Sequence, residues 1–89
     1  MVTREVVIKN RSGLESKSAA MLIQKASNYK SSIWVERDER KANAKSFLGL
    51  LSLGIANESK IVIIAEGADE AKAINEIEDY IKSGFGESV

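Results

Sequence analysis

The sequence contains no histidine and no cysteine, and these two absences exclude much of the chemistry that small proteins perform. Without cysteine the chain forms neither a disulfide nor a thiolate metal site. Without histidine it lacks the commonest neutral metal ligand and general base. Its acidic residues also do not repeat at the spacing of a calcium loop. We therefore expect a protein that is not an enzyme and that holds no metal or other cofactor.

Long hydrophobic runs and an excess of charge of one sign are also missing. Apolar runs such as Ile61–Ala65 are far shorter than the roughly 20 residues that cross a bilayer. The 13 basic and 13 acidic residues balance, whereas proteins that bind nucleic-acid phosphates or anionic membranes are usually basic. We therefore expect a soluble cytoplasmic protein whose partner is another protein, with no direct contact to nucleic acid or membrane.

The spacing of apolar residues predicts the elements of a single domain spanning residues 1–89, because a chain of 89 residues has room for one modest core. Strands are predicted at Val2–Ile8, Ser32–Arg37, Lys41–Asn43 and Ile61–Ala65, and helices at about Ser16–Asn28, at Ser46–Gly54 and between Asp69, as N-cap, and Gly84. This order predicts an α+β open-faced sandwich, in which three helices cover one face of a four-stranded antiparallel sheet. The tail Phe85–Val89 is expected to fray.

The short helix predicted at Ser46–Gly54 carries apolar residues on two sides. At about 100° per residue, Leu50 and Leu53 fall on one side, while Phe47, Leu48 and Leu51 fall on the other. A single core cannot bury both sides. The second side is therefore predicted to be an exposed apolar patch of the kind that marks a partner surface, unless a loop or the first helix covers it.

Ser46 lies where this helix begins, next to the basic Lys45. A helix N-terminus presents unpaired N–H groups and partial positive charge, so a phosphate on the Ser46 hydroxyl is stabilised there. Serine is also a common N-cap, whose hydroxyl accepts a backbone N–H without any regulatory role. Both interpretations stay open, and the apolar patch beside Ser46 favours a switch.

A second candidate is the segment Gly13–Ser18, which opens the first predicted helix. Glu15 comes close to the N-terminal amides of that helix, where a carboxylate is electrostatically favoured. Glu15 and Ser16 are also explained simply as caps of the helix. No nucleophile is paired with a base in this segment.

The stretch Asn43–Gly54, with the sequence NAKSFLGLLSLG, resembles the regulatory serine segment of HPr, the phosphocarrier of the sugar phosphotransferase system. The pairs Gly13–Leu14 and Ala19–Ala20 and the run Glu66–Glu70 also fall where HPr proteins carry similar residues. The resemblance covers nearly the whole chain, and it implies the βαββαβα sandwich expected above.

The phosphocarrier signature of that family is altered in this chain. HPr proteins carry glycine, an aliphatic residue, the active histidine, alanine, arginine and usually proline, whereas Gly13–Ser18 reads GLESKS. Glu15, at the histidine position, offers an anionic oxygen whose attack on a phosphorylated donor is electrostatically disfavoured. Lys17, at the arginine position, holds a phosphate only as a point charge. The resemblance thus implies a family member that is no longer a phosphocarrier.

The regulatory part of the resemblance is intact. Lys45, Ser46, Gly49 and Ser52 match the segment that an HPr-type serine kinase of Gram-positive bacteria phosphorylates. The chain is most similar to the catabolite-repression paralogues of HPr, which lack the active histidine and, once phosphorylated on serine, act as corepressors for a LacI-type catabolite regulator. The resemblance implies this regulator or another phosphotransferase-system protein as partner. The expected partner surface joins Lys17, Ala20 and Gln24 to Phe47, Leu48 and Leu51.

Three alternatives stay open. The protein could still carry phosphate, either as an acyl phosphate on Glu15 or through a donor unlike the usual one. Glu15 could instead imitate phosphohistidine permanently, so that partners bind the chain as though it were always phosphorylated. In the third, the open sheet face with Trp34 is a stacking platform for nucleic acid, although the net charge of zero disfavours it.

Overall fold

The computed structural model describes residues 1–9, 11 and 13–85. Its elements are β1 (Val2–Val7), α1 (Ser16–Ala26), β2 (Ser32–Arg37), β3 (Arg40–Asn43), α2 (Phe47–Ser52), β4 (Lys60–Glu66) and α3 (Glu70–Lys82). The predicted βαββαβα order and the α+β fold class are therefore confirmed. Within the described residues, no helix has the length and apolar character needed to cross a membrane.

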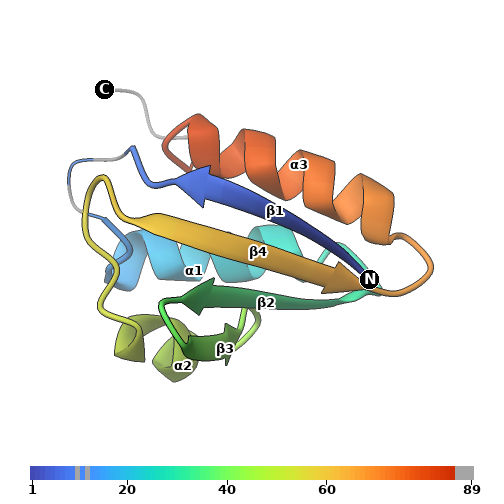
Figure 1. The fold of residues 1–89 in the computed structure, drawn as a ribbon, viewed down its shortest axis with the longest axis horizontal. Helices are drawn as coiled ribbons and strands as arrows, with labels where there is room; N and C mark the ends of the chain where they lie inside the picture. The colour runs from blue at the N-terminus through green and yellow to red at the C-terminus, as the bar shows by residue number, and fades with distance from the viewer. Residues whose placement is uncertain (10, 12, 86–89) are drawn as a thin grey trace.

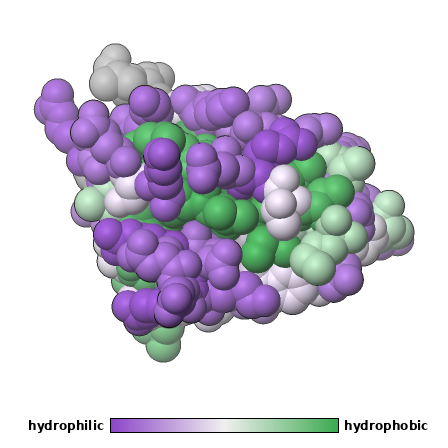
Figure 2. All heavy atoms as spheres, viewed as in Figure 1, coloured by the Kyte–Doolittle hydropathy of each residue, from purple (hydrophilic) through white to green (hydrophobic). Residues whose placement is uncertain are grey.

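The four strands form one antiparallel sheet in the order β1-β4-β2-β3. Asp38 and Glu39 make the turn between β2 and β3, and Asp38 takes a φ of 57°, which aspartate tolerates better than most residues. In Figure 1 the sheet faces the viewer and α1 passes behind it. Figure 2, in the same view, shows a strip of hydrophobic side chains on this open face, bordered by hydrophilic ones.

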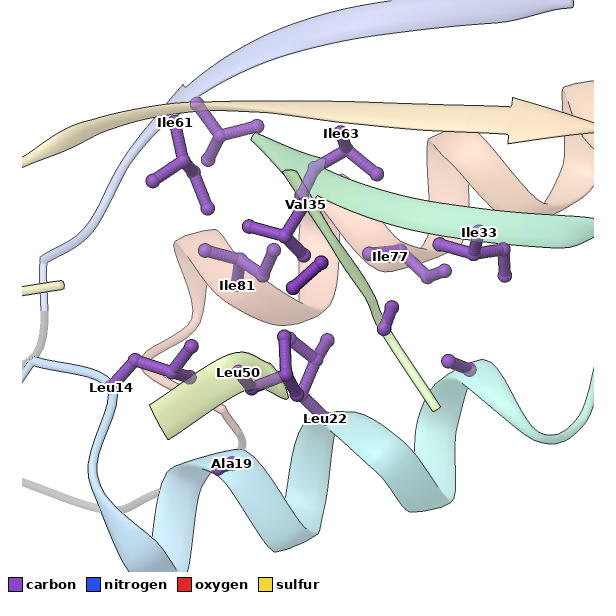
Figure 3. Packing of buried hydrophobic residues seen from close by; sticks show 14 of the residues in the cluster. Leu14, Ala19, Leu22, Ile33, Val35, Leu50, Ile61, Ile63, Ile77 and Ile81 are labelled. Carbon is purple, nitrogen blue, oxygen red and sulfur yellow. The ribbon is translucent and has the colours of Figure 1, made fainter. Parts of the chain in front are cut away.

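The core fills the space between the sheet and the helices (Figure 3). Alternate residues of the strands point into it, because successive side chains of a strand lie on opposite faces. The helices contribute residues three and four positions apart, which share one face. Full burial of each large aliphatic side chain contributes about 1.5–3 kcal/mol. The labelled members include Leu22, Ile33, Val35, Leu50, Ile61, Ile63, Ile77 and Ile81.

The predicted fraying of the tail is wrong at its first residue. Phe85 is fully buried, and its ring meets Tyr80 edge to face, with 6.0 Å between the ring centroids. The backbone N–H of Phe85 donates to the carbonyl of Tyr80 at 3.0 Å. The end of α3 is therefore folded back onto the core. The rest of the predicted tail, residues 86–89, lies outside the described residues.

Asp69 occupies the N-cap position of α3, but its side chain does not cap the helix as predicted. Its carboxylate accepts the backbone N–H groups of Lys30 and Ser31, each at 2.9 Å, and the hydroxyl of Ser31. The hydrogen bonds from Ser31 and Lys30 lower the pKa of Asp69 to about 2. This carboxylate ties the start of α3 to the turn between α1 and β2.

Candidate functional site

Glu15 is the N-cap residue of α1, and its side chain is exposed. Glu15 and Ser18 have the reciprocal arrangement of a capping box, in which the carboxylate approaches the Ser18 backbone N–H. The Ser18 hydroxyl accepts the backbone N–H of Glu15 at 3.0 Å and donates to the carbonyl of Gly13 at 2.9 Å. The predicted position of Glu15 at the helix amides is therefore confirmed, and its negative charge lies where the helix stabilises it.

The residues before Glu15 are held against the loop that precedes β4. Gly13 has a φ of 66°, and a Cβ at this position would lie 2.6 Å from the carbonyl oxygen of Ile55. Leu14 is buried, and its backbone N–H donates to the same carbonyl at 3.0 Å. Only glycine fits this close approach. The start of α1, and with it Glu15, is therefore fixed in position.

Lys17 lies in the first turn of α1, and its side chain is exposed. Within the part of the chain that the structure describes, its ammonium group has no hydrogen-bond or ion-pair partner. The beginning of α1 thus presents one anionic and one cationic side chain to solvent. A phosphoryl group approaching these amides would meet the Glu15 carboxylate, which repels it.

Ser46 is the N-cap of α2, as predicted. Its side-chain oxygen accepts the backbone N–H of Gly49 at 3.2 Å, and its carbonyl accepts the N–H of Leu50 at 3.0 Å. Ser46 is half-buried. A Cβ at Gly49 would lie 3.0 Å from the Ser46 hydroxyl, so the glycine keeps space open around this oxygen.

Lys45 does not point its charge at Ser46. Its ammonium donates to the backbone carbonyls of Tyr29 at 3.0 Å and of Ser31 at 3.3 Å, in the turn between α1 and β2. The expectation that Lys45 supplies positive charge beside the Ser46 hydroxyl therefore needs correction. Sequence spacing gives no signal for these contacts, because both carbonyls lie at least 14 residues away along the chain.

The two sides of α2 are separated much as predicted. Leu50 and Leu53 are buried, while Phe47 and Leu48 are 40% and 78% exposed. Leu51 is an exception, because it is partly buried and packs against the core. The reason is that α2 packs against both α1 and β3, so more than one side of this short helix is covered. The exposed patch therefore consists of Phe47 and Leu48.

Sequence analysis missed one residue that positions α2. The guanidinium of Arg37, at the end of β2, donates from Nη1 to the carbonyls of Leu53 at 3.1 Å and Gly54 at 3.0 Å. These carbonyls follow the last turn of α2 and would otherwise lack intrahelical partners. Arg37 thus holds the end of the helix whose beginning is Ser46.

The predicted residues of α1 share one exposed stripe. Lys17, Ala20 and Gln24 follow the spacing of a single helix face, and all three are exposed. Because α1 packs against α2, the two helices form one layer on the side of the sheet away from the viewer in Figure 1. We call the exposed residues Lys17, Ala20, Gln24, Phe47 and Leu48 the α1–α2 surface.

Comparison with known proteins agrees with this geometry. Residues 2–83 match the protein family described as the PTS HPr component phosphorylation site. The chain is 40% identical over 82 residues to the HPr-like protein Crh of Halalkalibacterium halodurans, covering 92% of this chain and 98% of that protein. It is 36% identical over 87 residues to the phosphocarrier protein HPr of Neisseria meningitidis, covering 98% of each. The crystal structure of HPr-C-His from Thermoanaerobacter tengcongensis aligns over the full length of both chains, with a TM-score of 0.94 and 44% identity.

The matched region includes both helix starts, with Glu15 and Ser46, and all four strands of the sheet. The relatives include proteins named as phosphocarriers and proteins named as HPr-like. On the extent of these matches and on its fold, the chain belongs to the HPr family of the phosphotransferase system.

Proposed function

We propose that this chain is a regulatory, non-phosphocarrier member of the HPr family, acting as one domain, whose binding to a regulator is controlled by phosphorylation of Ser46. The observation that carries the proposal is the contrast between the two helix starts. α1 begins with Glu15, where the family's phosphocarriers have histidine, whereas α2 begins with Ser46 beside the exposed Phe47 and Leu48.

Phosphate transfer is disfavoured by the chemistry of the first helix start. The chain contains no histidine at all, so it cannot form a phosphohistidine. The Glu15 carboxylate is anionic and faces helix amides, which further stabilise its charge. Attack on a negatively charged phosphoryl donor therefore costs more than attack by a neutral imidazole would.

The N-terminus of α2 suits a phosphate that a partner protein recognises. A phosphoryl group on the Ser46 hydroxyl adds about −1.5 to −2 charges. Because the Lys45 ammonium is bound to the carbonyls of Tyr29 and Ser31, the chain leaves much of that charge unpaired. A regulator with an arginine or lysine cluster would pair with the phosphate, while an apolar pocket takes Phe47 and Leu48.

The partners we propose are an HPr-type serine kinase, which installs the phosphate, and a LacI-type catabolite regulator, which reads it. Another phosphotransferase-system protein is a further candidate for the second role. The similarity to the HPr-like protein Crh supports a role of this kind. The docking surface would be the α1–α2 surface around Ser46.

The test combines mass spectrometry with binding measurements. With ATP and an HPr-type serine kinase, we expect one phosphate, mapped to Ser46, and tighter binding to the regulator. Ser46→Ala should abolish both effects and cost about 1 kcal/mol of stability through the lost N-cap. Ser52→Ala is the matched control, because Ser52 lies on the same helix and its hydroxyl donates to the carbonyl of Gly49. Modification of another serine, or equal binding with and without phosphate, contradicts the proposal.

A second candidate function is favoured by the position of Glu15. Its carboxylate sits at the amides of α1 as a permanent negative charge, so phosphotransferase-system partners could bind the chain as they bind phosphohistidine. In this case Glu15→Gln should weaken such binding, while the amide oxygen keeps the capping geometry. Unchanged binding of every phosphotransferase-system partner tested would leave Glu15 as a helix cap.

A further inference from the structure

Gly49 is the third residue of α2, and its backbone conformation does not require glycine. Positive φ values occur at Gly13, Gly54, Gly67 and Gly84, whereas Gly49 lies inside the helix with a negative φ that any residue adopts. Glycine in a helix interior lowers stability relative to alanine, because it loses more conformational freedom on folding. The physical reason for glycine at this position therefore lies in its surroundings.

The space that a side chain at position 49 would fill lies against Ser46. A Cβ there would be 3.0 Å from the Ser46 Oγ and 3.3 Å from the Ser46 Cβ. The next atom, the Cβ of Ala42 on β3, would be 3.4 Å away, which is ordinary van der Waals contact. The core and the sheet therefore accept a methyl group at position 49, and the tight contacts are with the Ser46 side chain alone.

The Ser46 hydroxyl is already held on one side by the helix. The backbone N–H of Gly49 donates to the Ser46 Oγ at 3.2 Å, and the Ser46 carbonyl accepts the N–H of Leu50 at 3.0 Å. The Ser46 residue is also half-buried. Only part of the surroundings of Oγ is thus open to a reactant, and a methyl group at position 49 would stand beside the same oxygen.

Phosphorylation of Ser46 needs this open space. The Ser46 Oγ forms a bond to the γ-phosphorus of ATP, the bond from that phosphorus to the bridging oxygen of ADP breaks, and the hydroxyl proton passes to a base of the kinase. The attacking and departing oxygens must lie roughly in line. The transferred group then places three oxygens close to Oγ. A Cβ at 3.0 Å from Oγ would compete for this volume, whereas glycine leaves it free.

Given the proposed phosphorylation of Ser46, on which this role rests, we propose that Gly49 is a positioning residue for that modification. The missing side chain keeps the Ser46 hydroxyl open to the kinase and to the phosphoryl group it receives. Gly49 acts through Ser46, whereas the exposed Phe47 and Leu48 offer contact area to a partner. The chain thus carries a helix-weakening residue at the one position of α2 where a side chain would obstruct the hydroxyl.

Steady-state kinetics with ATP and an HPr-type serine kinase test this role, with the modified site mapped by mass spectrometry. Gly49→Ala should lower kcat for Ser46 about tenfold or more and leave KM within about twofold, because it obstructs the transfer and not the docking. Gly49→Val, with a larger side chain, should lower kcat further. Urea denaturation should place the midpoint of Gly49→Ala at or above that of the wild type.

Asp79→Ala is the matched control for a change in helix stability. Asp79 is exposed on α3, and replacing it with alanine also raises helix propensity, but without adding an atom near Ser46. This variant should be phosphorylated with the wild-type kcat and KM. A fall in its kcat as large as that of Gly49→Ala would overturn the proposal, because helix stability and not space at Oγ would then limit the reaction.

The possible results distinguish the role of Gly49 from the proposed function. A wild-type chain that stays unmodified at Ser46 overturns both. Equal kcat for the wild type and Gly49→Ala, or a rise in KM alone, overturns the role of Gly49 and leaves the proposed function intact. A lower urea midpoint for Gly49→Ala would assign the glycine to the fold and likewise overturn its positioning role.

Discussion

At the scale of single residues, two side-chain contacts connect segments that are distant in sequence. Asp69 holds the backbone at Lys30 and Ser31, and the guanidinium of Arg37 holds the end of α2. Both place a charged group on backbone atoms that no helix or strand partner satisfies. Hydrogen bonds to ionised groups are stronger than those between neutral groups, and both contacts fix one segment of the chain against another.

The first prediction concerns the pH dependence that Asp69 imposes. Its pKa in the folded chain is about 2, below the value of about 3.9 for an unfolded aspartate. Its contribution to stability is therefore complete above pH ~4 and lost as the pH falls towards 2. Thermal unfolding should show a smaller decline over this range for Asp69→Asn than for the wild type. Asp79→Asn, at an exposed position of α3, should decline as the wild type does. Equal slopes for all three proteins would contradict this role.

The second prediction compares two glycines of similar backbone conformation. Gly13 and Gly54 have φ values of 66° and 61°, so alanine is strained at both by about 1–2 kcal/mol. At Gly13 the new Cβ would also lie 2.6 Å from the Ile55 carbonyl, whereas at Gly54 the nearest atom is 3.8 Å away. Urea denaturation should therefore show Gly13→Ala to be the more destabilising. A larger loss of stability for Gly54→Ala would mean that the loop before β4 shifts easily to make room for a Cβ at position 13.

At the scale of elements, α2 combines a buried side and an exposed apolar side within six residues. One side of the helix supplies Leu50 to the core, and the other leaves Phe47 and Leu48 in solvent. Ser46 and Arg37 hold its two ends. This division allows changes on the outer side without loss of the fold.

The third prediction separates the two sides of α2. Leu50→Ala removes a fully buried side chain and should cost about 2–5 kcal/mol. Leu48→Ala removes a side chain that is 78% exposed and should change stability by less than about 0.5 kcal/mol. Binding of the phosphorylated chain to its regulator should show the reverse order for folded protein, with the larger loss in Leu48→Ala. Similar destabilisation by both substitutions would mean that Leu48 belongs to the core.

At the scale of the whole molecule, the sheet separates two surfaces with different chemistry. The helical side carries the α1–α2 surface, with Glu15 and Ser46 at the starts of its helices. The open face carries the cross-strand pair Trp34 and Ile64. The chain contains no histidine, so neither surface offers the family's usual phosphoryl acceptor.

The fourth prediction follows from this absence. Labelled phosphoenolpyruvate and the general phosphotransferase enzyme should leave the wild-type chain unlabelled. The double variant Glu15→His with Lys17→Arg should acquire an acid-labile label. Its histidine supplies a neutral nucleophile, and its arginine can bind the phosphate through two parallel hydrogen bonds. Glu15→His alone should react more slowly than the double variant. Labelling of the wild type to stoichiometry would contradict the prediction and favour an acyl phosphate on Glu15.

Sequence patterns alone determined the order of the elements, the N-cap at Ser46, the buried and exposed sides of α2, and the position of Glu15 at the start of α1. Each depends on neighbours two to four residues apart, because strand and helix periodicity and caps are local. Tertiary structure decided the rest: the hydrogen bonds from Ser31 to Asp69, the Lys45 contacts, the partial burial of Leu51, the burial of Phe85 and the pairing of Trp34 with Ile64. These contacts join residues far apart in sequence, and their partners exist only once the sheet order β1-β4-β2-β3 brings the strands and turns together.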